Sequence, residues 1–148
     1  MFRIGIIGAG WIAEKICDAI VPFTDMEIYA IASRTTEKAE AFAAEHNIGK
    51  AYGSYEEMVC DPAIDLVYIA TPHSHHYDHA MLALEHGKPV LVEKAFTANA
   101  RQAKELIETA RSKGLFITEA IWTRYMPLSH KVREIMESGI IGEPRILT

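Results

Sequence analysis

Two hydrophobic patterns alternate along the chain. Short apolar runs of strand length are separated by segments in which apolar residues recur every three or four positions, as at Ala39, Phe42 and Ala43. The first pattern is typical of buried strands and the second of amphipathic helices. The apolar runs predict strands at residues 2–8, 26–33, 64–71, 89–95 and 115–120, with a weaker extended piece at 51–52. The periodic segments predict helices at residues 12–21, 36–47, 55–59, 74–87, 99–114 and 127–139.

This alternation predicts an α/β fold. The strands after the first are apolar on both faces, as in strands covered by helices above and below, and repeated β-α units favour a doubly wound parallel sheet. Asn99 is an expected helix N-cap, and Gly114 lies just past the end of that helix. We expect one domain at residues 1–121. At 122–148 we expect a connecting helix and the start of a second domain, with a strand beginning at 143–148.

Composition narrows the range of functions. The 148 residues suffice for one well-cored domain, and 49% of them are hydrophobic. The net charge of -5 argues against nucleic-acid binding, which requires a basic face. No apolar run has the length of a membrane span and no cleavable signal peptide is visible, so we expect a cytoplasmic protein without a membrane partner. The spacing of Cys17 and Cys60 fits neither a metal knuckle nor a redox pair, and we expect buried free thiols.

Gly8, Gly10 and Ala13 form a G-x-G-x-x-A motif between the first predicted strand and the first predicted helix. In a dinucleotide site the first glycine permits the tight turn and the second lets a pyrophosphate approach the backbone, while the small third residue packs near the sheet. The helix N-terminus then offers free N–H groups to the anion. An ordinary Gly-rich turn is the alternative. We favour the dinucleotide site, with Trp11 and Ile12 also in contact with the cofactor, because of its place in a repeating β-α chain.

The end of the second predicted strand indicates which nucleotide is preferred. A site selective for NAD carries Asp or Glu there, whereas this chain has Ser33 and Arg34. A hydroxyl and a guanidinium are suited to a 2'-phosphate, which a carboxylate would repel. The alternative is that Arg34 is a solvated loop residue. We expect NADP as the cofactor, with NAD less favoured.

Two further segments carry a family resemblance. The sequence ATPHSHHYDHAMLALEHGKPVLVEKA at 70–95 contains a Thr-Pro, a following histidine and a Glu-Lys pair, each near a predicted strand end. With the opening motif it resembles the Gfo/Idh/MocA family of oxidoreductases, over the whole chain. The segments AYGSYEEM at 51–58 and GLFITEAIWTRYMP at 114–127 are most similar to the branch that contains dihydrodiol and NADP-dependent xylose dehydrogenases.

The resemblance implies a set of site residues. Lys94 would be the catalytic residue, exchanging the substrate hydroxyl proton while hydride moves between substrate and nicotinamide. On the residues alone, Glu93-Lys94 is equally well an ordinary strand-end pair. The cofactor groove would also be lined by Thr71, Pro72, His76 and Glu93, with Trp122 and Arg124 close to the nicotinamide.

One position departs from the family pattern. Relatives usually have proline after the lysine, often at a cis bond, whereas this chain has Ala95. A cis bond before a non-proline residue costs about 2.5–4 kcal/mol. We therefore expect a trans Lys94–Ala95 bond and some shift of the loop that carries Lys94.

The cluster of histidines does not predict a metal site. His75 and His79 are four residues apart, and His76 and His79 are three apart, so pairs of them could share a helix face. No third ligand is spaced to complete a tetrahedral site. We expect no metal.

The predicted function is that of an NADP-dependent oxidoreductase acting on a sugar, a polyol or a cyclic trans-diol. A non-catalytic NAD(P)-binding module is the alternative, and a plain interaction domain is a weaker one. The resemblance implies a second, α+β substrate domain that is missing here and through which subunits pair as a homo-oligomer. We therefore expect these residues alone to bind NADP weakly and to turn over almost nothing.

Overall fold

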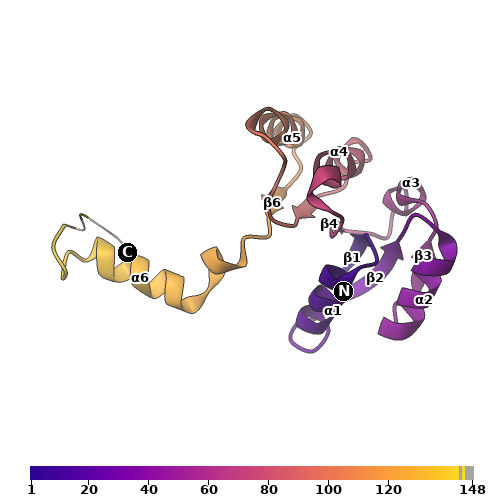
Figure 1. Cartoon of the computed structure of the whole chain (residues 1–148), viewed down its shortest axis with the longest axis horizontal. Coiled ribbons are helices and arrows are strands. Elements are labelled where there is room, and N and C mark those ends of the chain that lie inside the picture. The colour runs from indigo at the N-terminus through magenta and orange to yellow at the C-terminus, as the bar shows by residue number, and fades with distance from the viewer. Residues whose placement is uncertain (144, 146–148) are drawn as a thin grey trace.

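A computed structural model describes residues 1–143 and 145 of the chain. Its centre is one parallel sheet of six strands in the order β3-β2-β1-β4-β5-β6 (Figure 1). The strands are β1 (Phe2–Ile7), β2 (Met26–Ala32), β3 (Lys50–Tyr52), β4 (Leu66–Ile69), β5 (Val90–Val92) and β6 (Ile117–Glu119). The order reverses between β1 and β4, as in a doubly wound sheet, and this confirms the predicted fold class.

Helices cover the two faces of the sheet in separate groups. One face packs against α1 and α2, and the other against α3, α4 and α5, so two apolar cores form, one on each side. Helix α6 and two short 3-10 segments complete the chain. The helices are α1 (Trp11–Ile20), α2 (Thr36–His46), α3 (Tyr55–Val59), α4 (His76–Glu85), α5 (Ala100–Ser112) and α6 (Pro127–Glu137), with η1 (His73–His75) and η2 (Trp122–Tyr125).

Most helices and strands begin and end within a few residues of the boundaries predicted from the sequence. Asn99 caps α5 by accepting a hydrogen bond from the backbone of Gln102, and Gly114 follows that helix with a φ of 66°, as predicted. Cys17 is buried, and burial raises the pKa of its thiol to about 11. The prediction of a buried Cys60 was wrong. This thiol is exposed because it lies at the C-cap of a helix of only five residues, just past the last residue that packs inward, Val59.

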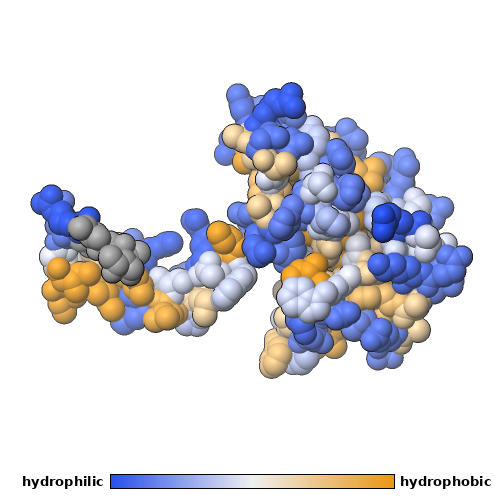
Figure 2. Space-filling model, viewed as in Figure 1, coloured by the Kyte–Doolittle hydropathy of each residue, from blue (hydrophilic) through white to orange (hydrophobic). Residues whose placement is uncertain are grey.

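The last part of the chain leaves the sheet. Helix α6 projects away from the strands in Figure 1, and apolar side chains on it are exposed, among them Leu128, Val132 and Met136 (Figure 2). The division at residue 121 stays a prediction. The strand expected at 143–148 falls largely on residues outside those that the structure describes. Within the described part of the chain, no helix has the length and apolarity needed to cross a membrane.

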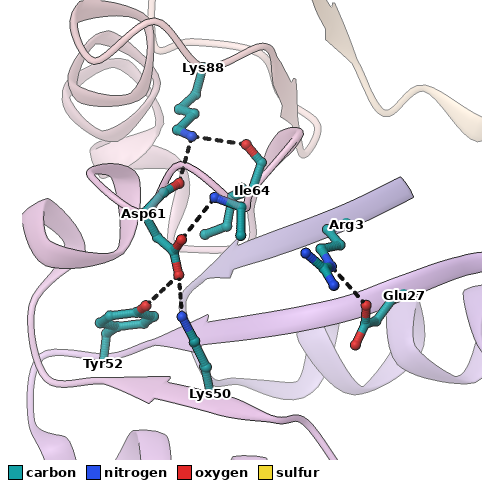
Figure 3. Close-up of polar contacts among 8 residues, drawn as sticks. Arg3, Glu27, Lys50, Tyr52, Asp61, Ile64 and Lys88 are labelled. Atoms are coloured by element: carbon teal, nitrogen blue, oxygen red, sulfur yellow. Dashed lines mark hydrogen bonds and ion pairs between the residues drawn. The ribbon is translucent and has the colours of Figure 1, made fainter. Parts of the chain in front are cut away.

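A network of hydrogen bonds centred on Asp61 joins β3 to the segments that precede β4 and β5 (Figure 3). The side chain of Asp61 is mostly buried; its Oδ2 accepts hydrogen bonds from Lys50 Nζ at 2.8 Å and Tyr52 OH at 2.7 Å. Its Oδ1 accepts from the backbone of Ala63 at 2.9 Å. Lys88 Nζ donates to the carbonyl of the same aspartate at 2.6 Å. The hydrogen bond from Lys50 is the main reason that the pKa of Asp61 lies well below its ordinary value.

Asp61→Asn is expected to lower the free energy of unfolding at pH 7 by about 1–3 kcal/mol, because hydrogen bonds to a charged group are replaced by weaker ones. Urea unfolding measures the change. The matched control is Asp18→Asn, since Asp18 pairs with Lys15 on the surface and should change stability by less than about 0.5 kcal/mol.

The effect of Asp61→Asn should depend on pH. Because the folded-state pKa is lowered, the carboxylate stabilises the fold fully above its unfolded-state pKa of about 3.9, and this contribution is lost as the pH falls toward the folded-state value. The difference between parent and variant should therefore narrow as the pH is lowered from about 5 to about 3. A difference that stays constant would show that the charge of Asp61 contributes nothing.

Candidate functional site

The carboxyl ends of three neighbouring strands meet at one edge of the sheet. The backbone N–H of Gly8 donates to Ala32 at 2.9 Å, and that of Ala70 donates to Ile7 at 2.9 Å, so the chain segments leaving β2, β1 and β4 lie side by side. In open α/β sheets this edge, at the point where the strand order reverses, is where ligands bind.

A cavity of about 420 Å³ opens at this edge. Its residues come from the ends of β1, β2 and β4, from the first turns of the helices that follow these strands, and from the start of α3. Among the sequence-predicted site residues it brings together Gly8, Gly10, Trp11, Ile12, Ser33, Arg34, Thr71 and Pro72. Ala13 lies beneath it with no exposed surface, which suits its expected role as the small residue between helix and sheet.

The two glycines of the turn have different physical roles. Gly8 has a φ of 106°, and a Cβ there would lie 2.9 Å from the carbonyl oxygen of Ala70. Gly10 is extended, with a φ of -135°, and a Cβ there would meet no atom within 4 Å. The first glycine is therefore required by the fold, whereas the second leaves open space over the N-terminus of α1, which no side chain caps. A helix N-terminus open in this way favours an anion.

Two cations lie on the β2 side of the cavity. Arg34 and Lys38 both line it, next to Ser33, which is 4% exposed. None of the described residues that line this cavity carries a carboxylate. The sequence reasoning missed Lys38. Its position, four residues after Arg34 in the first turn of the predicted helix 36–47, was the signal that could have identified it.

Three aromatic side chains that line the same cavity were also missed. Tyr55, His75 and His79 line the cavity, and His79 Nδ1 lies 3.0 Å from Thr71 Oγ1. The rings of Tyr55 and His79 meet edge to face, with centroids 4.6 Å apart. Burial, followed by the nearby His75, lowers the pKa of His79. Spacing along the sequence gave no signal for Tyr55, which comes from α3 and reaches His79 on α4 only in the folded chain.

Lys94 lies at a smaller hollow, of about 350 Å³, beyond the glycine turn. Trp11, Ile12, Thr71, Pro72, His73, His76, Glu93 and Lys94 line it. Glu93 Oε2 accepts a hydrogen bond from the backbone N–H of Lys94 at 3.1 Å, and Glu93 Oε1 accepts one from the buried hydroxyl of Tyr68. Burial, followed by this hydrogen bond to the carboxylate, raises the pKa of Tyr68. The Glu-Lys pair is thus fixed at the end of β5 by a buried tyrosine from the adjacent strand.

The peptide bond between Lys94 and Ala95 is cis, and the prediction of a trans bond was wrong. That prediction considered only the local preference of a non-proline amide. The turn is also held by groups distant in sequence, because the carbonyl of Ala95 lies 2.8 Å from His76 Nδ1 and the N–H of Phe96 donates to Glu119 at 2.8 Å.

Two expected site residues lie away from the glycine turn. Trp122 lines an apolar groove of about 460 Å³ on the sheet face beside α1, together with Leu66, Tyr68, Leu91 and Phe116. Arg124 is exposed in the same short segment and lines neither the cavity nor the hollow. Within the described part of the chain, no three residues of the metal-binding types are grouped to hold a metal ion.

A glycine turn over a helix N-terminus at the switch point of a doubly wound parallel sheet defines a dinucleotide-binding Rossmann domain. The chain belongs to the Gfo/Idh/MocA oxidoreductase family, whose NAD-binding Rossmann-fold model matches residues 2–120. The resemblance inferred from the motifs is therefore confirmed.

Among curated relatives, the chain is 51% identical over 150 residues to a D-xylose 1-dehydrogenase (NADP(+)) from Hypocrea jecorina, covering 93% of this chain and 38% of that protein. It is 42% identical over 146 residues to the mouse trans-1,2-dihydrobenzene-1,2-diol dehydrogenase, covering 97% of this chain and 44% of the mouse protein. The chain thus spans less than half the length of these relatives.

Solved structures agree with the fold. An NAD binding oxidoreductase from Klebsiella pneumoniae superposes with a TM-score of 0.88 at 34% identity, over 97% of this chain and 40% of that one. KijD10, a 3-ketoreductase from Actinomadura kijaniata solved in complex with NADP, superposes with a TM-score of 0.85 at 31% identity, over 96% of this chain and 45% of that one. The chain is therefore homologous to the nucleotide-binding part of NAD(P)-dependent oxidoreductases.

The two glycines of the turn make a matched pair of variants. Gly8→Ala should lower the free energy of unfolding by about 1–3 kcal/mol, because its Cβ meets the Ala70 carbonyl and its φ lies in the left-handed region. Gly10→Ala should change stability by less than about 1 kcal/mol, since its Cβ meets only open space. Urea unfolding compares the two. Equal losses would contradict the roles assigned to the glycines.

Proposed function

We propose that this chain is the coenzyme-binding part of an NADP-dependent dehydrogenase. The observation that carries the proposal is the cavity wall on which Ser33, Arg34 and Lys38 gather with no carboxylate among the described lining residues. A hydroxyl and two cations match the hydrogen-bonding and charge requirements of a 2'-phosphate. The similarity to the NADP(+)-dependent xylose dehydrogenase and to the NADP-bound ketoreductase supports the same choice over NAD.

The chemistry of the residues along the sheet edge suits the successive parts of such a coenzyme. The N–H groups of the turn at 8–13 would hold the pyrophosphate, with Ser33 and Arg34 at the adenosine end. Trp11, Thr71 and Pro72 line both the main cavity and the hollow that contains Lys94, so they connect the two compartments. The nicotinamide end would lie toward Glu93 and Lys94, with His76 behind it.

The proposed reaction is oxidation of a hydroxyl-bearing carbon in a sugar, a polyol or a cyclic trans-diol, or its reverse. The bound coenzyme supplies the hydride chemistry. Lys94 would exchange the substrate hydroxyl proton and polarise the substrate oxygen, because an amine beside a carboxylate at a strand end can act as a general acid or base. The names of the xylose and dihydrodiol dehydrogenases support this substrate class.

The 148 residues correspond to less than half of those relatives, so we infer that the substrate pocket requires more than this part. We expect these residues alone to bind NADP weakly and to turn over almost nothing. Pairing of subunits through a second domain, and closeness of Trp122 and Arg124 to the nicotinamide in the complete protein, belong to the same proposal. A non-catalytic NAD(P)-binding module is the second candidate. Coenzyme binding without turnover by the full-length protein would favour it.

Arg34→Ala is expected to weaken NADPH binding by about tenfold to a hundredfold and to change NADH binding by less than about threefold, because only NADPH carries the 2'-phosphate. Titration of coenzyme fluorescence measures both affinities. Arg111→Ala, at the end of α5, is the matched control and should leave both unchanged. Equal losses for the two coenzymes would contradict the proposed contact.

Lys94→Met is expected to keep coenzyme affinity within about threefold and to lower turnover about 10²- to 10⁴-fold, the usual contribution of a general acid-base group. Both are measured on the full-length protein, with a panel of aldoses and trans-diols. Lys113→Met, at the end of α5, serves as the matched control. Undiminished turnover by the Lys94 variant would remove this lysine from the mechanism.

A further inference from the structure

Side chains from both neighbouring strands hold the backbone of the turn that carries Lys94. This turn follows β5, which lies between β4 and β6 in the sheet. From β6, Glu119 Oε1 accepts a hydrogen bond from the N–H of Phe96 at 2.8 Å. From β4, Tyr68 OH donates to Glu93 Oε1, and Glu93 Oε2 accepts from the N–H of Lys94 at 3.1 Å. The backbone on either side of the intervening residue is therefore tied to a carboxylate.

We propose that Glu119 and Tyr68 are positioning residues for Lys94. Neither side chain lines the cavity at the glycine turn or the hollow that contains Lys94; both line the apolar groove on the sheet face. Glu119 acts on the turn directly, and Tyr68 acts through the carboxylate of Glu93. The role of Lys94 in the reaction rests on the proposed function, whereas the contacts that hold its backbone do not.

Strand register brings Glu119 to the turn. Glu119 is the last residue of β6 and lies opposite Val92, the last residue of β5, in the parallel pair. The N–H of Ala120 donates to the carbonyl of Val92 at 2.7 Å, so the two strand ends are fixed side by side. The side chain of Glu119 then has only the distance from one strand end to the adjacent turn to span. A backbone N–H bonded to a carboxylate is held more strongly than one bonded to a neutral acceptor.

Tyr68 fixes the other carboxylate from within the sheet face. It is 2% exposed and lies opposite Leu91 of β5, two residues before Glu93. Side chains two residues apart in an extended chain point to the same face, so the hydroxyl of Tyr68 and the carboxylate of Glu93 meet there. Glu93 borders the apolar groove as well as the hollow, and a carboxylate beside apolar side chains needs donors in place of water. Loss of the hydroxyl would free this carboxylate to rotate away from the N–H of Lys94.

The length of the lysine side chain makes a fixed backbone necessary. Its four-carbon stem is flexible, so the position of the ammonium group varies unless the turn beneath it is held. A general acid or base must lie within hydrogen-bond reach of the proton that it exchanges. A displacement of about 1 Å caused by a distant substitution can lower turnover about 10²-fold. Variants of Glu119 and Tyr68 should therefore slow turnover and leave coenzyme affinity nearly unchanged.

Glu119→Ala is expected to lower kcat about ten- to hundredfold and to keep the KM for NADP within about threefold. Glu119→Gln should keep kcat within about threefold of the parent value, since its amide oxygen still accepts from Phe96. Both are measured on the full-length protein. Glu27→Ala, which removes a carboxylate bonded to Arg3 near the start of β2, is the matched control and should change neither constant. Parent-like kcat in a folded Glu119→Ala protein, or a Glu119→Gln protein as slow as Glu119→Ala, would overturn the role of Glu119.

Tyr68→Phe removes only the hydroxyl and should lower kcat about tenfold, again with the KM for NADP within about threefold. Because Tyr68 acts through Glu93, the same substitution in a Glu93→Ala background should lower kcat by less than about twofold further. Losses that simply multiply would overturn the role of Tyr68. Tyr77→Phe is the matched control, because its hydroxyl bonds Glu105 at 2.8 Å between α4 and α5, and it should leave kcat unchanged.

Amide hydrogen exchange tests the contacts without coenzyme or turnover. In the free full-length protein, Tyr68→Phe should raise the exchange rate of the Lys94 amide about tenfold, the value of roughly one hydrogen bond, and Glu119→Ala should do the same for the Phe96 amide. Unchanged rates in both variants would overturn the inference whatever the activity. If the rates rise but the parent protein neither binds NADPH nor turns over, the proposed function fails, and with it the role in turnover, while the contacts stand.

Discussion

Parallel pairing of β1 with β2 on one side and β4 on the other is the constraint on which the rest of the molecule depends. It brings three strand ends to one edge, where Gly8 is hydrogen-bonded to the end of β2 and lies against the backbone that leaves β4. The space at Gly8 is so small that a Cβ would meet the Ala70 carbonyl. The position of the glycine turn is thus fixed by backbone contacts, and the open space over Gly10 follows from it.

The neighbouring strand ends then carry different chemistry. The end of β2 presents a hydroxyl and two cations, whereas the ends of β4 and β5 are joined by His76 and the Tyr68–Glu93 hydrogen bond. The first arrangement is suited to binding a charged group, and the second holds the turn that carries Lys94 in place. Because Trp11, Thr71 and Pro72 line both compartments, one extended ligand can contact both.

The parts of the site that follow a local rule could be predicted from the sequence. The glycine spacing, the residues at the end of β2 and the Glu-Lys pair all lie within a few residues of a strand end, and strand ends are visible as breaks in the hydrophobic pattern. Tyr55 and His79 could not be found in this way, since their contact joins two helices. Lys38 could have been predicted from the sequence, because it follows Arg34 by one helical turn. A lysine is common in the exposed first turn of a helix, however, so its residue type did not mark it as a site residue.

The sequence by itself determined the alternation of strands and helices, the parallel sheet and the glycine turn, because these depend on hydrophobic periodicity and on residues close together in the chain. Tertiary structure decided the conformation of the Lys94–Ala95 bond, the placement of Trp122 on the sheet face and the two carbonyl partners of His76. Each of these depends on a contact between segments far apart in sequence. Such contacts exist only once the strands have taken their order in the sheet.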